Sequence, residues 1–258
     1  MTLATTIYVP TGIVIAADSR MILSAHENLA DGKVLIRQKV ISDTSYKLVA
    51  VDQPPLGVAI VGHHFVAGQP ANCLVERFVA ERAGRIHGPA ELAELLATEF
   101  DERFPLSGPA GFFVESPTDV ARALAASFSG AGPRAAPDVG FYIAGYQDDD
   151  GQRHPYVAYV SANPRRVQRL NRRPDNQSLV YGAAWAGDRD IVDRLLQNAP
   201  LVPFEFMSLD DAVCLAIDLV EVTARMQRWR PTIETVGGPV DVLVVTPEGT
   251  RWVRRKRG

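Results

Sequence analysis

Four residues near the start of the chain have the side chains and spacing that a nucleophilic site requires: Thr2, Asp18, Lys47 and Gly62. If Met1 is removed, Thr2 carries both a hydroxyl nucleophile and an α-amine, which titrates at about pH 7.7–8.0 and can act as a base. A nearby lysine would lower the pKa of that amine, and an aspartate would orient the lysine and balance its charge. The N–H of a glycine at the end of a strand would stabilise an oxyanion.

Lysine is scarce in this sequence, which limits the candidates for such a site. Of the 27 basic residues, four are lysines: Lys33, Lys39, Lys47 and Lys256. Arginine does not replace a tunable ammonium, because its pKa is too high. Lys47 precedes an apolar run and lies fifteen residues before Gly62. Lys33 and Lys39 are nearer to Asp18 in sequence and remain alternatives, although they fall in a polar loop or an extra segment.

The order of predicted elements indicates how these residues are positioned. Alternation and β-branched residues predict strands, and apolar residues at helical spacing predict helices. The predicted strands are 5–9, 13–17, 47–51, 57–61, 139–146, 156–161, 178–184, 240–245 and 250–253. The predicted helices are 70–82, 89–104, 116–128, 189–198 and one capped by Ser208. Strands and helices in separate blocks favour a layered α+β protein with antiparallel sheets.

Several motifs in this order resemble a proteasome β-type subunit, a member of the N-terminal nucleophile (Ntn) hydrolases. The early motifs are Thr5-Thr6-Ile7, the run from Gly12 to Arg20, Tyr46-Lys47-Leu48 and the run from Gly57 to Gly62. The later ones are Ile143-Ala144-Gly145-Tyr146, Tyr156, Tyr181-Gly182-Ala183-Ala184 and the run from Gly237 to Val242. The resemblance covers most of the chain, and the early motifs are the more specific.

The resemblance implies a single domain over residues 1–258 with a four-layer αββα sandwich, two antiparallel sheets between helix layers. It implies a threonine peptidase without a cofactor, acting on a peptide or protein and assembled as a ring-like homo-oligomer. Thr2 would be the nucleophile, with Asp18 and Lys47 tuning it and Gly62 holding the oxyanion. Counting back from Asp18 without gaps reaches Thr2, while Thr5 or Thr6 would require a shorter hairpin. No motif indicates whether an ATPase takes part.

The sequence departs from the family pattern in four places. It is longer between Asp18 and Lys47, with an extra loop near 21–44, and it has an irregular insertion near 105–137. The serines that usually support the site are missing from Gly182-Ala183-Ala184-Trp185, and the supporting aspartate is missing before Gly237. Thr235 and Glu234 could substitute in part. Two alternatives therefore stay open: a non-catalytic scaffold subunit, and an amidase for one small substrate.

Composition excludes other classes of protein. The 258 residues are 47% hydrophobic and carry a net charge of −3, which argues against disorder and against a nucleic-acid binder. The sequence has no apolar run of about 18 residues, so no membrane span is predicted. No signal peptide is apparent, and a cytoplasmic location is therefore expected.

Cys73 and Cys214 are expected in the core. His63 and His64 follow Gly62, where they could border a substrate channel, and their adjacency does not suit a metal site. Trp185 and Trp229 are expected in the core or at subunit contacts.

Overall fold

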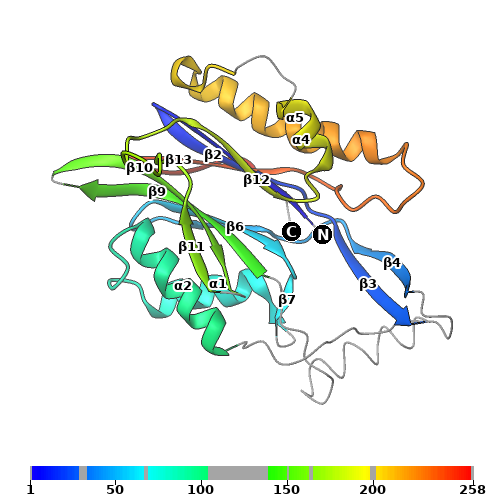
Figure 1. Cartoon of the computed structure of the whole chain (residues 1–258). Coiled ribbons are helices and arrows are strands. Elements are labelled where there is room, and N and C mark those ends of the chain that lie inside the picture. Colours follow the sequence, from blue (N-terminus) through cyan, green and yellow to red (C-terminus); the bar gives the residue numbers. More distant parts are fainter. Residues whose placement is uncertain are drawn as a thin grey trace.

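The computed structural model describes residues 2–28, 34–66, 69–103, 139–149, 151–162, 165–197 and 202–256. The centre of the fold is formed by two five-stranded antiparallel sheets (Figure 1). The first has the strand order β12 (Gly182–Gly187), β1 (Leu3–Val9), β2 (Gly12–Ala17), β13 (Asp241–Thr246) and β14 (Gly249–Arg254). The second has the order β11 (Arg166–Arg169), β10 (Gln152–Ser161), β9 (Val139–Asp149), β6 (Leu56–Gly62) and β5 (Leu48–Val51).

Two smaller antiparallel sheets stand apart from these. One pairs β3 (Met21–Asn28) with β4 (Val34–Ser42), and the other pairs β7 (Phe65–Val66) with β8 (Gln69–Pro70). The β3–β4 pair extends away from the two large sheets (Figure 1). The segment 21–44, in which an extra loop is expected, therefore contains two long paired strands.

The helices pack on the outer sides of the large sheets. They are α1 (Ala71–Glu81), α2 (Pro89–Arg103), α4 (Asp190–Gln197) and α5 (Leu209–Gln227), with a 3-10 turn η1 (Phe204–Phe206) before α5. Helix α2 contacts β9 and β10, whereas α5 contacts β1 and β2. The Ser208 side chain caps α5 by accepting a hydrogen bond from the N–H of Asp211 at 3.1 Å. This confirms the predicted cap.

The core forms three apolar clusters, one between the two large sheets and one under each pair of helices. Strand β1 is completely buried because it pairs with β12 on one side and β2 on the other. Its first residues and the end of β2 therefore lie at a rigid, shielded edge of the core. That edge positions the predicted site.

The predicted four-layer αββα sandwich is wrong as a description of this chain. Among the described residues strands outnumber helices, and they form four antiparallel sheets with four α-helices; the two small sheets fit no helix–sheet–sheet–helix layering. The error has a physical origin in Met21–Asn28, part of the expected loop, which pairs with Val34–Ser42 and forms a separate sheet. The predicted helix 116–128 and the insertion near 105–137 lie outside the described residues.

Candidate active site

A buried ion pair joins two of the four predicted site residues. The Nζ atom of Lys47 lies 2.7 Å from Oδ1 of Asp18, and neither side chain is accessible to water. Asp18 directly follows β2, and Lys47 directly precedes β5, so the pair bridges the two large sheets. Of the other candidate lysines, Lys39 is exposed on β4 and Lys33 lies outside the described residues.

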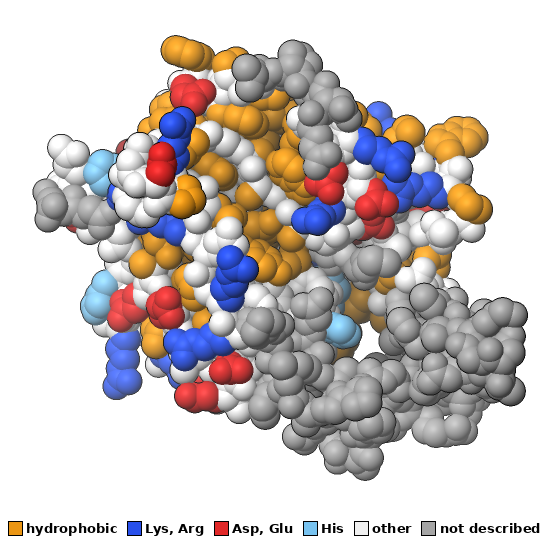
Figure 2. Space-filling view, viewed as in Figure 1, with side chains coloured by type: hydrophobic (Ala, Val, Ile, Leu, Met, Phe, Trp, Pro, Cys, Tyr) orange, Lys and Arg blue, Asp and Glu red, His pale blue; other side chains and the backbone are white. Residues whose placement is uncertain are grey.

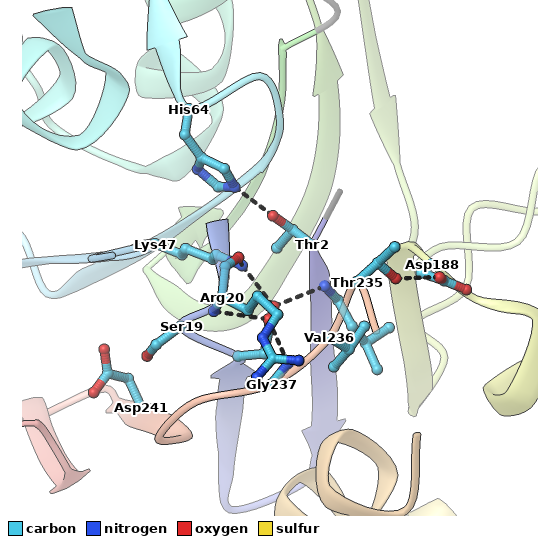
Figure 3. Close-up of polar contacts among 12 residues, drawn as sticks. Thr2, Ser19, Arg20, Lys47, His64, Asp188, Thr235, Val236, Gly237 and Asp241 are labelled. Carbon is cyan, nitrogen blue, oxygen red and sulfur yellow. Dashed lines mark hydrogen bonds and ion pairs between the residues drawn. The ribbon is translucent and has the colours of Figure 1, made fainter. Parts of the chain in front are cut away.

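Backbone groups complete the surroundings of this pair. Asp18 accepts hydrogen bonds from the N–H groups of Leu3, Arg20 and Gly237, each at 3.0 Å. Lys47 also donates to the carbonyl oxygen of Arg20 at 2.7 Å (Figure 3). Hydrogen bonds from several donors stabilise a carboxylate in its charged form. Asp18 is thus held rigidly, and it fixes Lys47 next to the start of β1.

Burial sets the electrostatics of Lys47. Removal of its ammonium from water lowers the pKa of Lys47 below its usual range, and the charge and hydrogen bond of Asp18 oppose that change. Lys256 and Arg20 lower the pKa further through their positive charges. The pair therefore contains an amine that gives up its proton more readily than an exposed lysine does.

Thr2 lies immediately before β1 and is fully buried. Its carbonyl oxygen accepts a hydrogen bond from the N–H of Asp188 at 2.8 Å. Its neighbour Leu3 donates to Asp18, so the main chain connects Thr2 to the ion pair. The Oγ1 atom of Thr2 forms a short hydrogen bond with Nε2 of His64 (Figure 3).

His64 is a site residue that sequence reasoning did not assign to the chemistry. Gly62 ends β6 with φ of +86°, and the chain then turns through His63 to His64. The His64 backbone is tied down, because its carbonyl oxygen accepts from the N–H of Ala71 at 2.8 Å. The sequence signal for this residue was the adjacent pair His63-His64 after Gly62. That signal could not be interpreted without the tertiary contact between His64 and Thr2.

The two alternative threonines occupy different surroundings. Thr5 and Thr6 lie inside β1, where both are fully buried. The Thr5 hydroxyl donates to the carbonyl oxygen of Ala216 in α5 at 3.5 Å, on the side of the sheet that the helix covers. Among the described residues, the Thr6 hydroxyl has no hydrogen-bond partner.

A second polar network lies beside the site, where the supporting serines and aspartate are missing. The Thr235 hydroxyl donates to Asp188 (Figure 3). The Gln227 side chain donates to the same carboxylate at 2.9 Å. Gln227 also accepts from the N–H groups of Thr235 and Val236 at 2.7 and 2.9 Å. This network fixes the loop whose Gly237 N–H binds Asp18. Glu234 takes a different role and pairs with Arg20 at 3.0 Å.

Two searches of the described residues concern other kinds of site. In the described ranges, no three His, Cys, Asp or Glu side chains come together in a way that could hold a metal ion. Within the same ranges, every helix is too short or too polar to cross a membrane.

Comparison with solved structures assigns the fold. A Gly-1 mutant of Anbu from Hyphomicrobium sp. strain MC1 aligns with a TM-score of 0.56 and 17% identity, over 100% of this chain and 87% of that one. Anbu from Yersinia bercovieri, described as an ancestral beta-subunit, aligns with a TM-score of 0.54 and 15% identity, over 97% and 86% of the two chains. The fold is that of the Anbu proteins.

At these identities the likeness to Anbu concerns the fold alone. No protein-family model matches the sequence, and no curated protein matches it. The expected membership of the proteasome β-type subunits and Ntn hydrolases is therefore corrected: the two solved structures compared with this chain are Anbu proteins, and they show its fold alone.

Proposed function

We propose that this protein is a peptidase that cleaves amide bonds with Thr2 as its nucleophile after Met1 has been removed. One observation carries the proposal: the buried Lys47–Asp18 pair at 2.7 Å, whose carboxylate also binds the N–H of Leu3, the residue next to Thr2. A buried ammonium is costly unless it is paired, and a tuned amine beside an N-terminal hydroxyl suits nucleophilic attack. The Anbu fold is compatible with this activity.

The proposed roles follow from this geometry. The free α-amine of Thr2 takes the hydroxyl proton, and Lys47 lowers the pKa of that amine through its charge. Asp18 holds Lys47, and the N–H of Gly62 donates to the oxyanion. The amine of the cleaved peptide leaves with a proton, and water then hydrolyses the ester on Thr2.

Two other functions remain as competitors. A non-catalytic subunit is favoured by one observation, the complete burial of Thr2. A small-substrate amidase would share the same residues but would not cleave peptides. Thr5 is a poorer nucleophile than Thr2, because its hydroxyl bonds to α5 and lies inside a strand paired on both sides.

The test is intact-mass spectrometry after incubation with a peptide epoxyketone, a reagent that needs both the hydroxyl and the free amine. We expect loss of Met1 and one adduct, located on Thr2 by fragmentation, together with hydrolysis of fluorogenic peptides. The variants T2A and K47M should lose the adduct. Because Lys39 is exposed on β4, K39M is the matched control and should keep it.

Each competitor predicts a different result. A folded chain with free Thr2 and no adduct would indicate a non-catalytic subunit. An adduct without hydrolysis of any peptide would indicate the amidase. An adduct on Thr5 or Thr6 would overturn the choice of Thr2.

A further inference from the structure

The hydrogen bond between His64 and Thr2 is the strongest feature that the proposed roles do not use. Nε2 of His64 is the side-chain partner of Thr2 Oγ1, and the two side chains point toward each other (Figure 3). His64 approaches from the end of β6, whereas Lys47 and Asp18 approach from the ends of β5 and β2. Thr2 Oγ1 therefore has a nitrogen beside it that is independent of its own α-amine.

The charge state of His64 suits the role of a proton acceptor. Removal from water lowers the pKa of His64 well below its usual range, and the positive charges of Lys47, the N-terminal amine and His63 lower it further. The ring is neutral at physiological pH, so one nitrogen has a free lone pair. As a whole residue His64 is partly buried, whereas Thr2 is fully buried.

We propose that His64 is a catalytic residue whose Nε2 takes the proton from the Thr2 hydroxyl, so that Thr2 can be acylated even when its nitrogen is not a free amine. This inference rests on the proposed function, because it concerns the same nucleophile. It differs in the base, which is a side chain and not the α-amine.

The proposed proton transfer can be followed with a reagent that forms an ester on Thr2, such as a β-lactone. The bond from Thr2 Oγ1 to the lactone carbonyl carbon forms as the hydroxyl proton moves to His64 Nε2. The ring carbon–oxygen bond then breaks, and His64 returns that proton to the departing oxygen. The chain gains the whole mass of the lactone, and His64 ends neutral.

The test measures the rate of β-lactone acylation of Thr2 by intact mass, which separates chains with and without Met1 in one spectrum. In wild type, we expect the adduct on both forms. In H64Q, acylation of the Met1-bearing form should fall by about 100-fold or more, the usual effect of losing a general base. The matched control is H87Q, which removes an exposed imidazole just before α2, outside the site, and should acylate at the wild-type rate. Equal rates in H64Q and wild type would overturn the proposal.

The pH dependence of the wild-type protein tests the same idea if H64Q does not fold. The Met1-bearing form should acylate at a nearly constant rate from about pH 6 to pH 8, because a neutral His64 does not change its charge there. The groups that face the ring and could modulate this rate are Lys47, the N-terminal amine and His63. A rise of about tenfold per pH unit would indicate attack without a general base and would overturn the proposal.

The two proposals fail in distinguishable ways. An epoxyketone adduct on free Thr2 with lactone acylation unaffected by H64Q would retain the proposed function and remove His64 from it. Acylation that depends on His64, without any epoxyketone adduct, would retain His64 as a base and remove the α-amine mechanism. An absence of both adducts in the folded chain would overturn both.

Discussion

At the scale of single residues, the site depends on charges held without water. Lys47 and Asp18 are fully buried, and each is the other's counter-ion. Removing one partner of such a pair leaves an uncompensated buried charge, which costs far more free energy than the intact pair contributes. By contrast, the ion pair between Arg20 and Asp43 at 2.7 Å includes a carboxylate that is 45% exposed.

The variant D18N should therefore be much less stable than D43N. We expect D18N to lower the free energy of unfolding by about 3–5 kcal/mol, because Lys47 loses its counter-ion and Leu3, Arg20 and Gly237 lose a charged acceptor. D43N should cost about 0–1 kcal/mol, as solvent-exposed pairs do. Urea unfolding followed by circular dichroism measures both. Equal losses would show that the buried pair has no special importance.

His64 should make the stability of the folded chain sensitive to acid. Its pKa in the folded chain lies well below the value of about 6.5 that it takes when unfolded, so acidification protonates the unfolded chain first. The free energy of unfolding should be unaffected by this group above about pH 6.5 and should fall below it. Between pH 7 and pH 5 the loss from His64 should reach up to about 2 kcal/mol.

Urea titrations at both pH values in wild type, H64Q and H87Q check this expectation. H64Q should lose less stability on acidification than wild type, while H87Q, which removes an exposed imidazole before α2, should keep the wild-type dependence. The same pH dependence in H64Q and wild type would show that another group causes it.

At the scale of elements, the start of β1 is positioned from β12 as well as from β2. Leu3 pairs with Gly187 at the end of β12, and the next residue, Asp188, donates its N–H to the Thr2 carbonyl oxygen. Gly187 has φ of +104°, and a Cβ atom added there would lie 1.5 Å from that same oxygen. Only glycine permits the two strands to approach so closely at this point.

G187A should therefore displace Thr2 as well as strain β12. We expect a loss of more than about 3 kcal/mol in the free energy of unfolding and a lower yield of Thr2 adducts. The matched variant is G151A, at a turn with φ of +79° and open space around the added Cβ. It should cost only the backbone strain, about 1–2 kcal/mol. Similar losses in both variants would exclude the contact with Thr2 as the cause.

At the scale of the whole molecule, the side covered by α4 and α5 presents large apolar side chains to solvent. Phe206 and Trp229 are 89% and 84% exposed, and Met226 and Leu195 are 50% and 42% exposed. Hydrophobic side chains reach the surface where α4 and α5 lie (Figure 2). Exposed aromatic residues of this size are typical of surfaces that bind other proteins. We propose that a second copy of the chain covers them, in line with the expected homo-oligomer.

Light scattering after size-exclusion chromatography tests this assembly. Wild type should have a mass that is a multiple of the 28.1 kDa chain, and the double variant F206S/W229S should shift toward the single chain. I41S is the control, because Ile41 is 39% exposed on β4, away from these helices. A monomeric wild type would overturn the assembly.

Local patterns predicted the elements better than the contacts between them. The predicted helix at 70–82 is α1, Ala71–Glu81, and helical periodicity was sufficient to find it. The same reasoning was wrong for Cys73 and Cys214, both of which are exposed. In α1 the buried residues are Ala71, Leu74, Val75 and Phe78, so Cys73 falls outside the buried stripe although it lies within an apolar segment.

The site was predictable only where a motif marked it. Asp18 and Lys47 each adjoin a strand that the sequence pattern predicts, and the resemblance of their motifs to proteasome β-type subunits indicated that they pair. The contact of His64 with Thr2, and the bonds from Gln227 and Thr235 to Asp188, join segments 62, 39 and 47 residues apart. Such contacts depend on how whole sheets and helices pack, which residue types and spacing do not specify.

The backbone torsions of the left-handed turn at Gly62 determine the positions of two separate groups in the site. The N–H assigned to the oxyanion belongs to Gly62, and the ring that contacts Thr2 follows two residues later. A residue that shifts φ at 62 would displace both together, so the effects of G62A and H64Q should not add in a double-mutant cycle. During evolutionary drift, a change at Gly62 would also displace His64. Divergent relatives of this chain that lose the glycine turn should therefore lose the histidine contact as well.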